Sequence, residues 1–103
     1  MSVFFSPKVS VIVPCFNAEK TIERCIKSII NQTYRNFNII IVDDCSTDNS
    51  VSIIRQSIVY FHCKIRLISS KKNVGPSLAR RIGILESNSD YLMFCDSDRK
   101  SVV

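Results

Sequence analysis

The chain has 103 residues, of which 46% are hydrophobic and 22% are charged, so it suits one small globular domain and excludes a disordered chain. Its formal net charge of +5 favours an anionic partner, without choosing among nucleotides, nucleic acid and acidic membrane surfaces. Because the basic residues are scattered and form no tract, we expect no nucleic-acid binding.

Five cysteines occur, an odd number, and no two of them form a Cys-x-x-Cys pair. This usage argues against a disulfide scaffold or a zinc site and favours reduced, mostly buried thiols. The residues before the first strand are too few and lack the charge of a signal peptide, and no apolar run could cross a bilayer. We therefore expect a cytoplasmic chain, which an anchor further downstream would hold at the inner face of the membrane.

The first half of the chain alternates strand and helix patterns. Val9–Val13 is a β-branched apolar run ended by Pro14, which predicts a buried strand. Thr21–Ile30 carries apolar residues at helical spacing and predicts a helix. Asn38–Val42 is a second continuous apolar run and predicts a second strand.

The same alternation continues after the second strand. Asp48 or Asn49 is expected to cap a helix that runs through Val51 to Ile58. Ile65–Ile68 predicts a third, shorter strand.

A third helix and a fourth strand complete the pattern. Pro76 or Ser77 is expected to begin the helix, because proline suits the first helical turn. Tyr91–Cys95 predicts the strand. The apolar residues on one face of this helix are Leu78, Ile82 and Leu85.

The order βαβαβαβ with strands apolar throughout is typical of a parallel sheet covered by helices on both faces. Right-handed crossovers then bring all strand-to-helix loops to one edge of the sheet. These loops are Pro14–Asn17, Asp43–Asp48, Ser70–Gly75 and Asp96–Asp98. Two of them carry acidic clusters, and open α/β sheets bind ligands beyond the carboxyl ends of their strands. The sequence therefore predicts a metal-assisted site for an anionic ligand at this edge.

Only two glycines occur, Gly75 and Gly83, so the chain has neither a G-x-G-x-x-G turn nor a G-x-x-x-x-G-K loop. The charge of a diphosphate would have to be met by Mg²⁺ or Mn²⁺ and by basic side chains. Asp96 and Asp98 could give one carboxylate to a ribose and the other to the metal. Arg80 could offset the remaining phosphate charge.

Six segments resemble the family 2 glycosyltransferases, in the right order and over nearly the whole chain. They are Val9–Asn17, Ser28–Tyr34, Ile40–Asp48, Asn73–Gly75, Ala79–Arg80 and Tyr91–Asp98. The resemblance implies the GT-A fold, a Rossmann-like and mostly parallel sheet. It also implies transfer of a sugar from a nucleotide diphosphate donor to an acceptor, with inversion and usually with Mn²⁺ or Mg²⁺. Such enzymes often build bacterial surface polysaccharides, so the acceptor would be a glycan or a lipid-linked molecule.

The resemblance also implies how the nucleoside is bound. Pro14, Phe16 and Asn17 would form the nucleotide-facing loop, with Phe16 against the base. Glu19 matches a position that touches the base in some members. Asp44 matches the uracil-contacting carboxylate, which implies a UDP-linked donor.

The ribose and diphosphate end of the donor would meet a second set of residues. Asp96 matches the first acid of the family's D-x-D, near the ribose, and Asp98 matches the metal ligand. Arg80 matches the arginine of an Ala-Arg-Asn pattern. Asn73 and Gly75 belong to a matching segment and are expected to line the donor site.

Three further positions in these motifs are not assigned to the donor: one is expected to support a loop, and two depart from the family pattern. Asp43 is expected to support its loop. Cys45 replaces the usual glycine and is expected to alter the loop, since glycine reaches positive φ freely. Arg81 replaces the usual asparagine.

The resemblance stops at the second acidic cluster. In the family an acceptor-binding half follows and supplies the catalytic base, so the base is unknown here and we expect no turnover from this chain alone. Back-translated with a stop codon, residues 98–103 read GAT CGG AAG AGC GTC GTG TAG, a common sequencing-adapter sequence. We therefore expect residues 1–97 to be the nucleotide-sugar-binding half, truncated after the fourth strand, and residues 98–103 to be an assembly artefact. Asp98 would then match the motif by coincidence.

Two other interpretations remain open at this stage. One is a non-catalytic nucleotide-binding remnant. The other is a receiver-like signalling domain, which would need an isolated phosphoacceptor Asp after a middle strand and a Lys after the last. The third strand is followed by Ser69–Lys71, without an Asp, which argues against a receiver.

Overall fold

The computed structural model describes residues 7–61 and 64–97. The elements in chain order are β1 (Val9–Cys15), α1 (Ile22–Ile30), β2 (Phe37–Asp43), α2 (Ser50–Phe61), β3 (Ile65–Ser69), α3 (Pro76–Glu86) and β4 (Tyr91–Phe94). They confirm the predicted order and types, with ends that differ by at most three residues. The predicted metal ligand Asp98 and the segment 98–103 lie outside the described residues.

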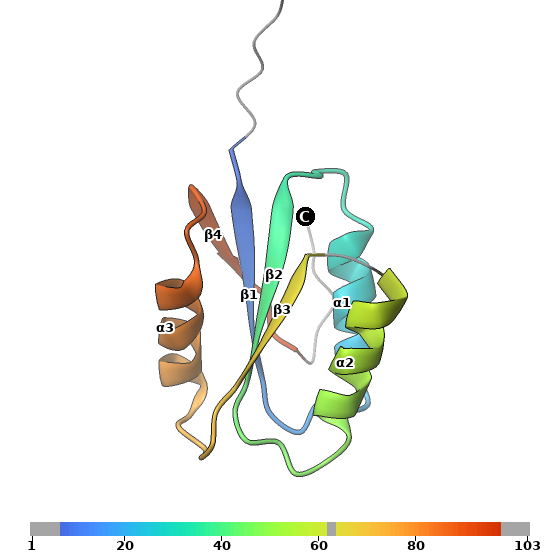
Figure 1. Cartoon of the computed structure of the whole chain (residues 1–103), viewed down its shortest axis with the longest axis vertical. Helices are drawn as coiled ribbons and strands as arrows, with labels where there is room; N and C mark the ends of the chain where they lie inside the picture. Colours follow the sequence, from blue (N-terminus) through green and yellow to red (C-terminus); the bar gives the residue numbers. More distant parts are fainter. Residues whose placement is uncertain (1–6, 62–63, 98–103) are drawn as a thin grey trace, which may run out of the picture.

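The strands form one parallel sheet in the order β3-β2-β1-β4. Helices α1 and α2 cover one face of the sheet and α3 covers the other (Figure 1). From β1 the chain moves outward through β2 to β3, and β4 then pairs with the opposite side of β1. A doubly wound sheet binds its ligands where the strand order reverses in this way, at the carboxyl ends of the strands.

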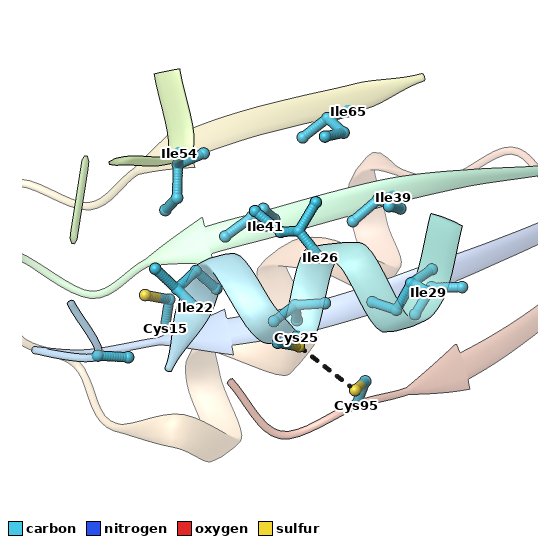
Figure 2. Packing of buried hydrophobic residues seen from close by; sticks show 13 residues of the cluster. Cys15, Ile22, Cys25, Ile26, Ile29, Ile39, Ile41, Ile54, Ile65 and Cys95 are labelled. Carbon is cyan, nitrogen blue, oxygen red and sulfur yellow. Dashed lines mark hydrogen bonds between the residues drawn. The ribbon is translucent and has the colours of Figure 1, made fainter. Parts of the chain in front are cut away.

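Strands β1 and β2 are buried on both faces, which explains their continuous apolar sequences. Val13 and Ile41 belong to the cluster under α1 and α2, whereas Ile12 and Ile40 belong to the cluster under α3. This alternation follows from the two-residue period of a strand. Figure 2 shows Ile26 of α1 among the side chains of the first cluster. The central strands are therefore fixed from both sides, and so are the loops that leave them.

Helix α3 contacts the sheet through small residues. Its buried positions are Ala79 and Gly83, and a Cβ at Gly83 would lie 2.5 Å from Ile12 Cγ2. The apolar face predicted from the sequence is wrong in part, because Leu78 and Leu85 are 45% and 74% exposed. The helix is rotated so that its small side chains, rather than its leucines, face β1 and β2. This close approach carries the start of α3 to the edge of the sheet.

The prediction that Pro14 ends the first strand is wrong, since β1 continues to Cys15 and Pro14 is in register with Val42. The Ile12 carbonyl accepts a hydrogen bond from the Cys95 amide at 3.0 Å, so the backbone of residue 14, two positions on, also faces the β4 side. Strand β4 has ended there, so the missing N–H of proline interrupts no ladder.

Candidate functional site

The loops that follow the four strands surround one pocket with a volume of about 1000 Å³. All nine described residues that the sequence analysis assigned to the donor site line this pocket. They are Pro14, Phe16, Asn17, Glu19, Asp44, Asn73, Gly75, Arg80 and Asp96. The prediction that these loops meet at one edge is confirmed, and the role of each residue in binding stays a prediction.

The loop after β1 is held by side chains of the loop after β2 and of the first residue of α2. Three consecutive amides donate to them: Asn17 N to Ser46 Oγ at 2.9 Å, Ala18 N to Ser50 Oγ at 2.8 Å, and Glu19 N to Asp48 Oδ2 at 3.1 Å. We call these contacts the loop clasp. The short polar side chains between Asp43 and Ser50 thus replace a glycine-rich turn as the means of shaping the pocket wall.

The side chain of Asn17 accepts a further hydrogen bond from the loop after β2. Its backbone has φ +48°, a conformation that asparagine tolerates better than most residues. Its side-chain Oδ1 accepts the Thr47 amide at 2.8 Å. Asn17 therefore positions both loops, a task that the sequence analysis did not assign to it.

Asp48 carries negative charge in the loop clasp. Burial would raise its pKa, but hydrogen bonds from the Ser50 hydroxyl and from the Ser50 and Glu19 amides outweigh burial and hold this pKa below its usual value. The Ser50 amide, at the start of α2, donates to Asp48 Oδ1 at 2.9 Å. The predicted cap of the second helix is thus Asp48, and the same carboxylate also joins the two loops.

Asp43 is buried and supports its own loop, as expected. Its carboxylate accepts the Ser46 amide at 3.0 Å and the Ser46 hydroxyl at 2.6 Å. Its carbonyl accepts the Ser70 amide at 2.8 Å, which links the ends of β2 and β3. The negative charge of Asp43, after burial itself, helps to raise the pKa of the neighbouring Cys15 thiol to about 12.

Asp44 joins the second loop to the third. It is 4% exposed, and its two carboxylate oxygens accept the Val74 amide at 2.7 Å and the Gly75 amide at 2.8 Å. An ionised carboxylate has roughly four acceptor sites, so two remain for a ligand in the pocket that Asp44 lines. Asp44 is therefore both a structural acceptor and an available one, and only the second role was predicted.

The third loop leads directly into α3. Gly75 has φ +90°, a conformation that favours glycine, and its carbonyl accepts the Ala79 amide at 3.0 Å. Gly75, Pro76 and Arg80 all line the pocket. The amino end of a helix favours negative charge, so this wall suits an anionic ligand.

Arg80 and Asp96 form an ion pair across the pocket, with Arg80 Nη2 3.8 Å from Asp96 Oδ1. Both side chains are more than a third exposed, so water screens the pair and its contribution to stability is small. Cys95 is buried, whereas Asp96, the next residue in the chain, is exposed.

Cys45 adopts φ +63°, which supports the interpretation that this position suits glycine. Its sulfur lies 3.6 Å from the Lys71 carbonyl oxygen. A residue with a Cβ thus occupies a conformation that favours glycine, at the cost of strain.

The family model for glycosyl transferase family 2 matches residues 10–99. The chain belongs to this family. An uncharacterized glycosyltransferase of Haemophilus influenzae is 40% identical over 92 residues, which are 89% of this chain and 36% of that relative. The chain thus spans about a third of the length of this relative and less of many others.

Solved structures of other glycosyltransferases share the GT-A fold with this chain. The structure of S. aureus TarS 1-349 in complex with UDP-GlcNAc matches with a TM-score of 0.81 and 31% identity, over 88% of this chain and 26% of TarS. The mannosyltransferase PcManGT from Pyrobaculum calidifontis, in complex with GDP-Man and Mn²⁺, matches with a TM-score of 0.88 over 96% of this chain and 30% of the enzyme. At 24% identity, this match supports the fold alone.

Membership in family 2 rules out the receiver-like interpretation.

The site of this family 2 chain also includes residues that the sequence analysis did not assign to donor binding. Lys20 and Asp48 line the pocket. The position of Lys20 directly after Glu19 is the sequence signal that points to it. From the sequence alone, Asp48 is predicted only as a helix cap.

Proposed function

We propose that this chain forms the donor-binding part of a glycosyltransferase that moves a sugar from a UDP-linked donor to an acceptor hydroxyl with inversion. The observation that carries the proposal is that all nine predicted residues line one pocket of about 1000 Å³, in a chain of family 2. Pockets for small molecules measure roughly 300–1,000 Å³, so a nucleotide sugar fits this volume. The relative TarS, crystallised with UDP-GlcNAc, supports the choice of nucleotide.

The nucleoside end of the donor is proposed to lie between Phe16 and Asp44. Phe16 is half-exposed at the pocket wall and offers a ring for stacking on a base. Asp44 has acceptor capacity beyond its two amide contacts, so it would accept the ring N–H of uracil. Cytosine lacks that hydrogen, and its ring nitrogen would repel the carboxylate.

The diphosphate end is proposed to lie near Arg80 and Asp96. Arg80 would exchange part of its contact with Asp96 for a phosphate oxygen, since the pair is exposed and weak. Asp96 would accept a ribose hydroxyl.

A divalent cation, Mn²⁺ or Mg²⁺, is proposed as the cofactor. Within residues 7–61 and 64–97 no three His, Cys, Asp or Glu side chains gather as a metal site. Mg²⁺ often uses one or two carboxylates plus substrate phosphates, so a full cluster of protein ligands is not required. Asp98 is the residue that would hold the ion, while Asp96 keeps its proposed contact with the ribose. When bound, the ion would supply Lewis-acid charge to the departing diphosphate.

The acceptor is proposed to be a glycan or a lipid-linked molecule, used on the cytoplasmic side of the membrane. In the described part of the chain, no helix has both the length and the apolar character needed to span a bilayer. The net charge of +5 supports association with an anionic membrane surface. We also propose that the chain alone gives no turnover, because no residue that it offers is assigned as the base. Release of UDP from a UDP-sugar, Mn²⁺ and candidate acceptors, above the rate without acceptor, would contradict this.

The proposal is tested by titrating the chain with UDP and with CDP by isothermal titration calorimetry in the presence of Mn²⁺. We expect UDP to bind about tenfold more tightly, because Asp44 can accept a hydrogen bond from uracil and not from the cytosine ring nitrogen. Phe16→Ala should weaken UDP binding by about 1–3 kcal/mol, the range for stacking of one base. The matched control is Tyr60→Ala, which removes an exposed ring from α2 and should leave the affinity unchanged. Equal binding of UDP and CDP, or no binding at millimolar UDP, would contradict the proposal.

A further inference from the structure

Two cysteines from distant parts of the sequence meet in the buried cluster, next to Asp96, which lines the pocket. Cys25 of α1 and Cys95, directly after β4, are 70 positions apart, and their sulfur atoms lie 3.6 Å from each other. Figure 2 marks this contact with a dashed line. Both residues are buried, at 0% and 8% exposure, within the cluster under α1 and α2.

We propose that Cys25 and Cys95 are a modification site at which a two-electron thiol oxidant forms a reversible disulfide that ties α1 to the end of β4. A disulfide bond measures about 2.05 Å, so the two sulfurs must approach by roughly 1.5 Å. Strand β4 can supply this movement, because among the described residues it pairs with β1 alone and its four side chains are exposed.

The backbone around the pair already holds the sulfurs side by side. Both thiols lie near one acceptor, the Asp96 carbonyl oxygen, at 3.6 Å from Cys25 and 3.7 Å from Cys95. Cys45, by contrast, places its sulfur near the Lys71 carbonyl in another loop. The direct contact between their sulfur atoms is what selects Cys25 and Cys95 among the described thiols.

The reaction removes one hydrogen from each thiol and forms the S–S bond. The two electrons and two protons pass to the oxidant: diamide is reduced at its N=N bond to a hydrazine, and a small disulfide is reduced to two thiols. A reducing dithiol reverses the step by exchange. The hydrogen bond with Cys95, and then burial, raise the pKa of Cys25, so the thiolate is scarce at neutral pH. Oxidation is accordingly expected to be slow at pH 7 and faster as the pH rises.

The cross-link would also fix the backbone of Asp96, which follows Cys95 in sequence. This consequence for donor binding rests on the proposed function, whereas the disulfide itself does not. The disulfide is therefore detected by peptide mapping in the absence of any nucleotide.

The test treats the folded chain with diamide and maps its tryptic peptides without reduction. Each of the five cysteines lies in a different tryptic peptide, and the expected product joins Cys25–Lys27 to Ile82–Arg99 with the loss of two hydrogen atoms. Dithiothreitol should separate the two peptides again. A mixed pattern of pairs, or no linkage of these two peptides after treatment at pH 8.5, would overturn the proposal.

Two variants sharpen the result. Cys25→Ser should abolish the linked peptide, whereas Cys15→Ser, which replaces another buried thiol of the same cluster, should leave it intact. If Cys25→Ser does not fold, urea unfolding of the unaltered chain decides. The oxidised form should unfold at a higher urea concentration than the reduced form, because the cross-link restricts the unfolded chain. A lower midpoint for the oxidised form would show that the native geometry does not accept the bond, and would overturn the proposal.

Discussion

The two sides of the pocket are built differently. On the side of β1 and β2, the loop clasp and Asp44 hold one loop after another through buried or half-buried side chains. On the side of β4, Asp96 contributes an exposed ion pair, and the strand before it has four exposed side chains. We call the first the rigid side, because several hydrogen bonds hold it, and the second the adjustable side, because an exposed ion pair holds it.

This difference separates two tasks in the proposed donor site. A base needs a pocket of fixed shape, and a preformed wall lowers the cost of ordering on binding. A diphosphate brings charge that must displace the contact between Arg80 and Asp96, so a weakly held wall suits it. We expect substitutions of the hydrogen-bonding side chains on the rigid side to change stability first, and substitutions on the β4 side to change binding first.

The largest effect is expected from Asp44→Ala on the rigid side. The variant leaves the Val74 and Gly75 amides without their acceptor, and hydrogen bonds to charged groups contribute about 1.5–3 kcal/mol each. We expect the free energy of unfolding to fall by about 3 kcal/mol in urea titrations. The control is Asp90→Ala, whose carboxylate accepts one exposed amide, that of Lys8, and which should lose much less. Similar losses in the two variants would mean that the Asp44 contacts do not hold the pocket wall.

A smaller change, of opposite sign, is expected at Cys45. Its φ of +63° costs a residue with a Cβ about 1–2 kcal/mol, and glycine adopts this conformation freely. Part of the gain is lost to the greater freedom of glycine in the unfolded chain, so Cys45→Gly should stabilise the fold by about 0.5–1 kcal/mol. Cys45→Ala keeps the Cβ and should give no such gain. A gain of equal size in both variants would point to the thiol rather than to the backbone.

The loop clasp should also give the rigid side an acid sensitivity. Because the pKa of Asp48 is lower in the folded chain than its ordinary 3.8, its contribution to stability is present above the unfolded pKa and is lost as the pH falls through the folded pKa. Asp48→Asn should therefore lose less stability than the unaltered chain between about pH 5 and pH 2. Ser50→Ala removes a donor to Asp48, so this variant should also lose less stability at acid pH than the unaltered chain. An unchanged acid profile in Asp48→Asn would contradict this origin.

The sequence predicted the strands and the meeting of the loops, but not the contacts that hold them. The strands were predictable because β1 and β2 are buried on both faces, and the meeting of the loops followed from the parallel order. The partners of Asp44 were not predictable, since Val74 and Gly75 lie 30 and 31 positions away and contribute only backbone amides. The rotation of α3 was also missed, because a close approach through Gly83 depends on the shape of Ile12 and not on helical spacing.

The smallest effect on stability is expected at Arg80, on the adjustable side. The pair with Asp96 is exposed on both sides, so Arg80→Gln should change the free energy of unfolding by less than about 0.5 kcal/mol. Its effect on binding should depend on the ligand: UDP should bind about tenfold more weakly, and uridine, which has no phosphate, should bind unchanged. The matched variant is Asp96→Asn, which removes the opposite charge of the ion pair. It should not weaken UDP binding selectively over uridine binding. Equal weakening of UDP and uridine by Arg80→Gln would place Arg80 at the base instead, and the division between a rigid nucleoside wall and an adjustable phosphate wall would fail.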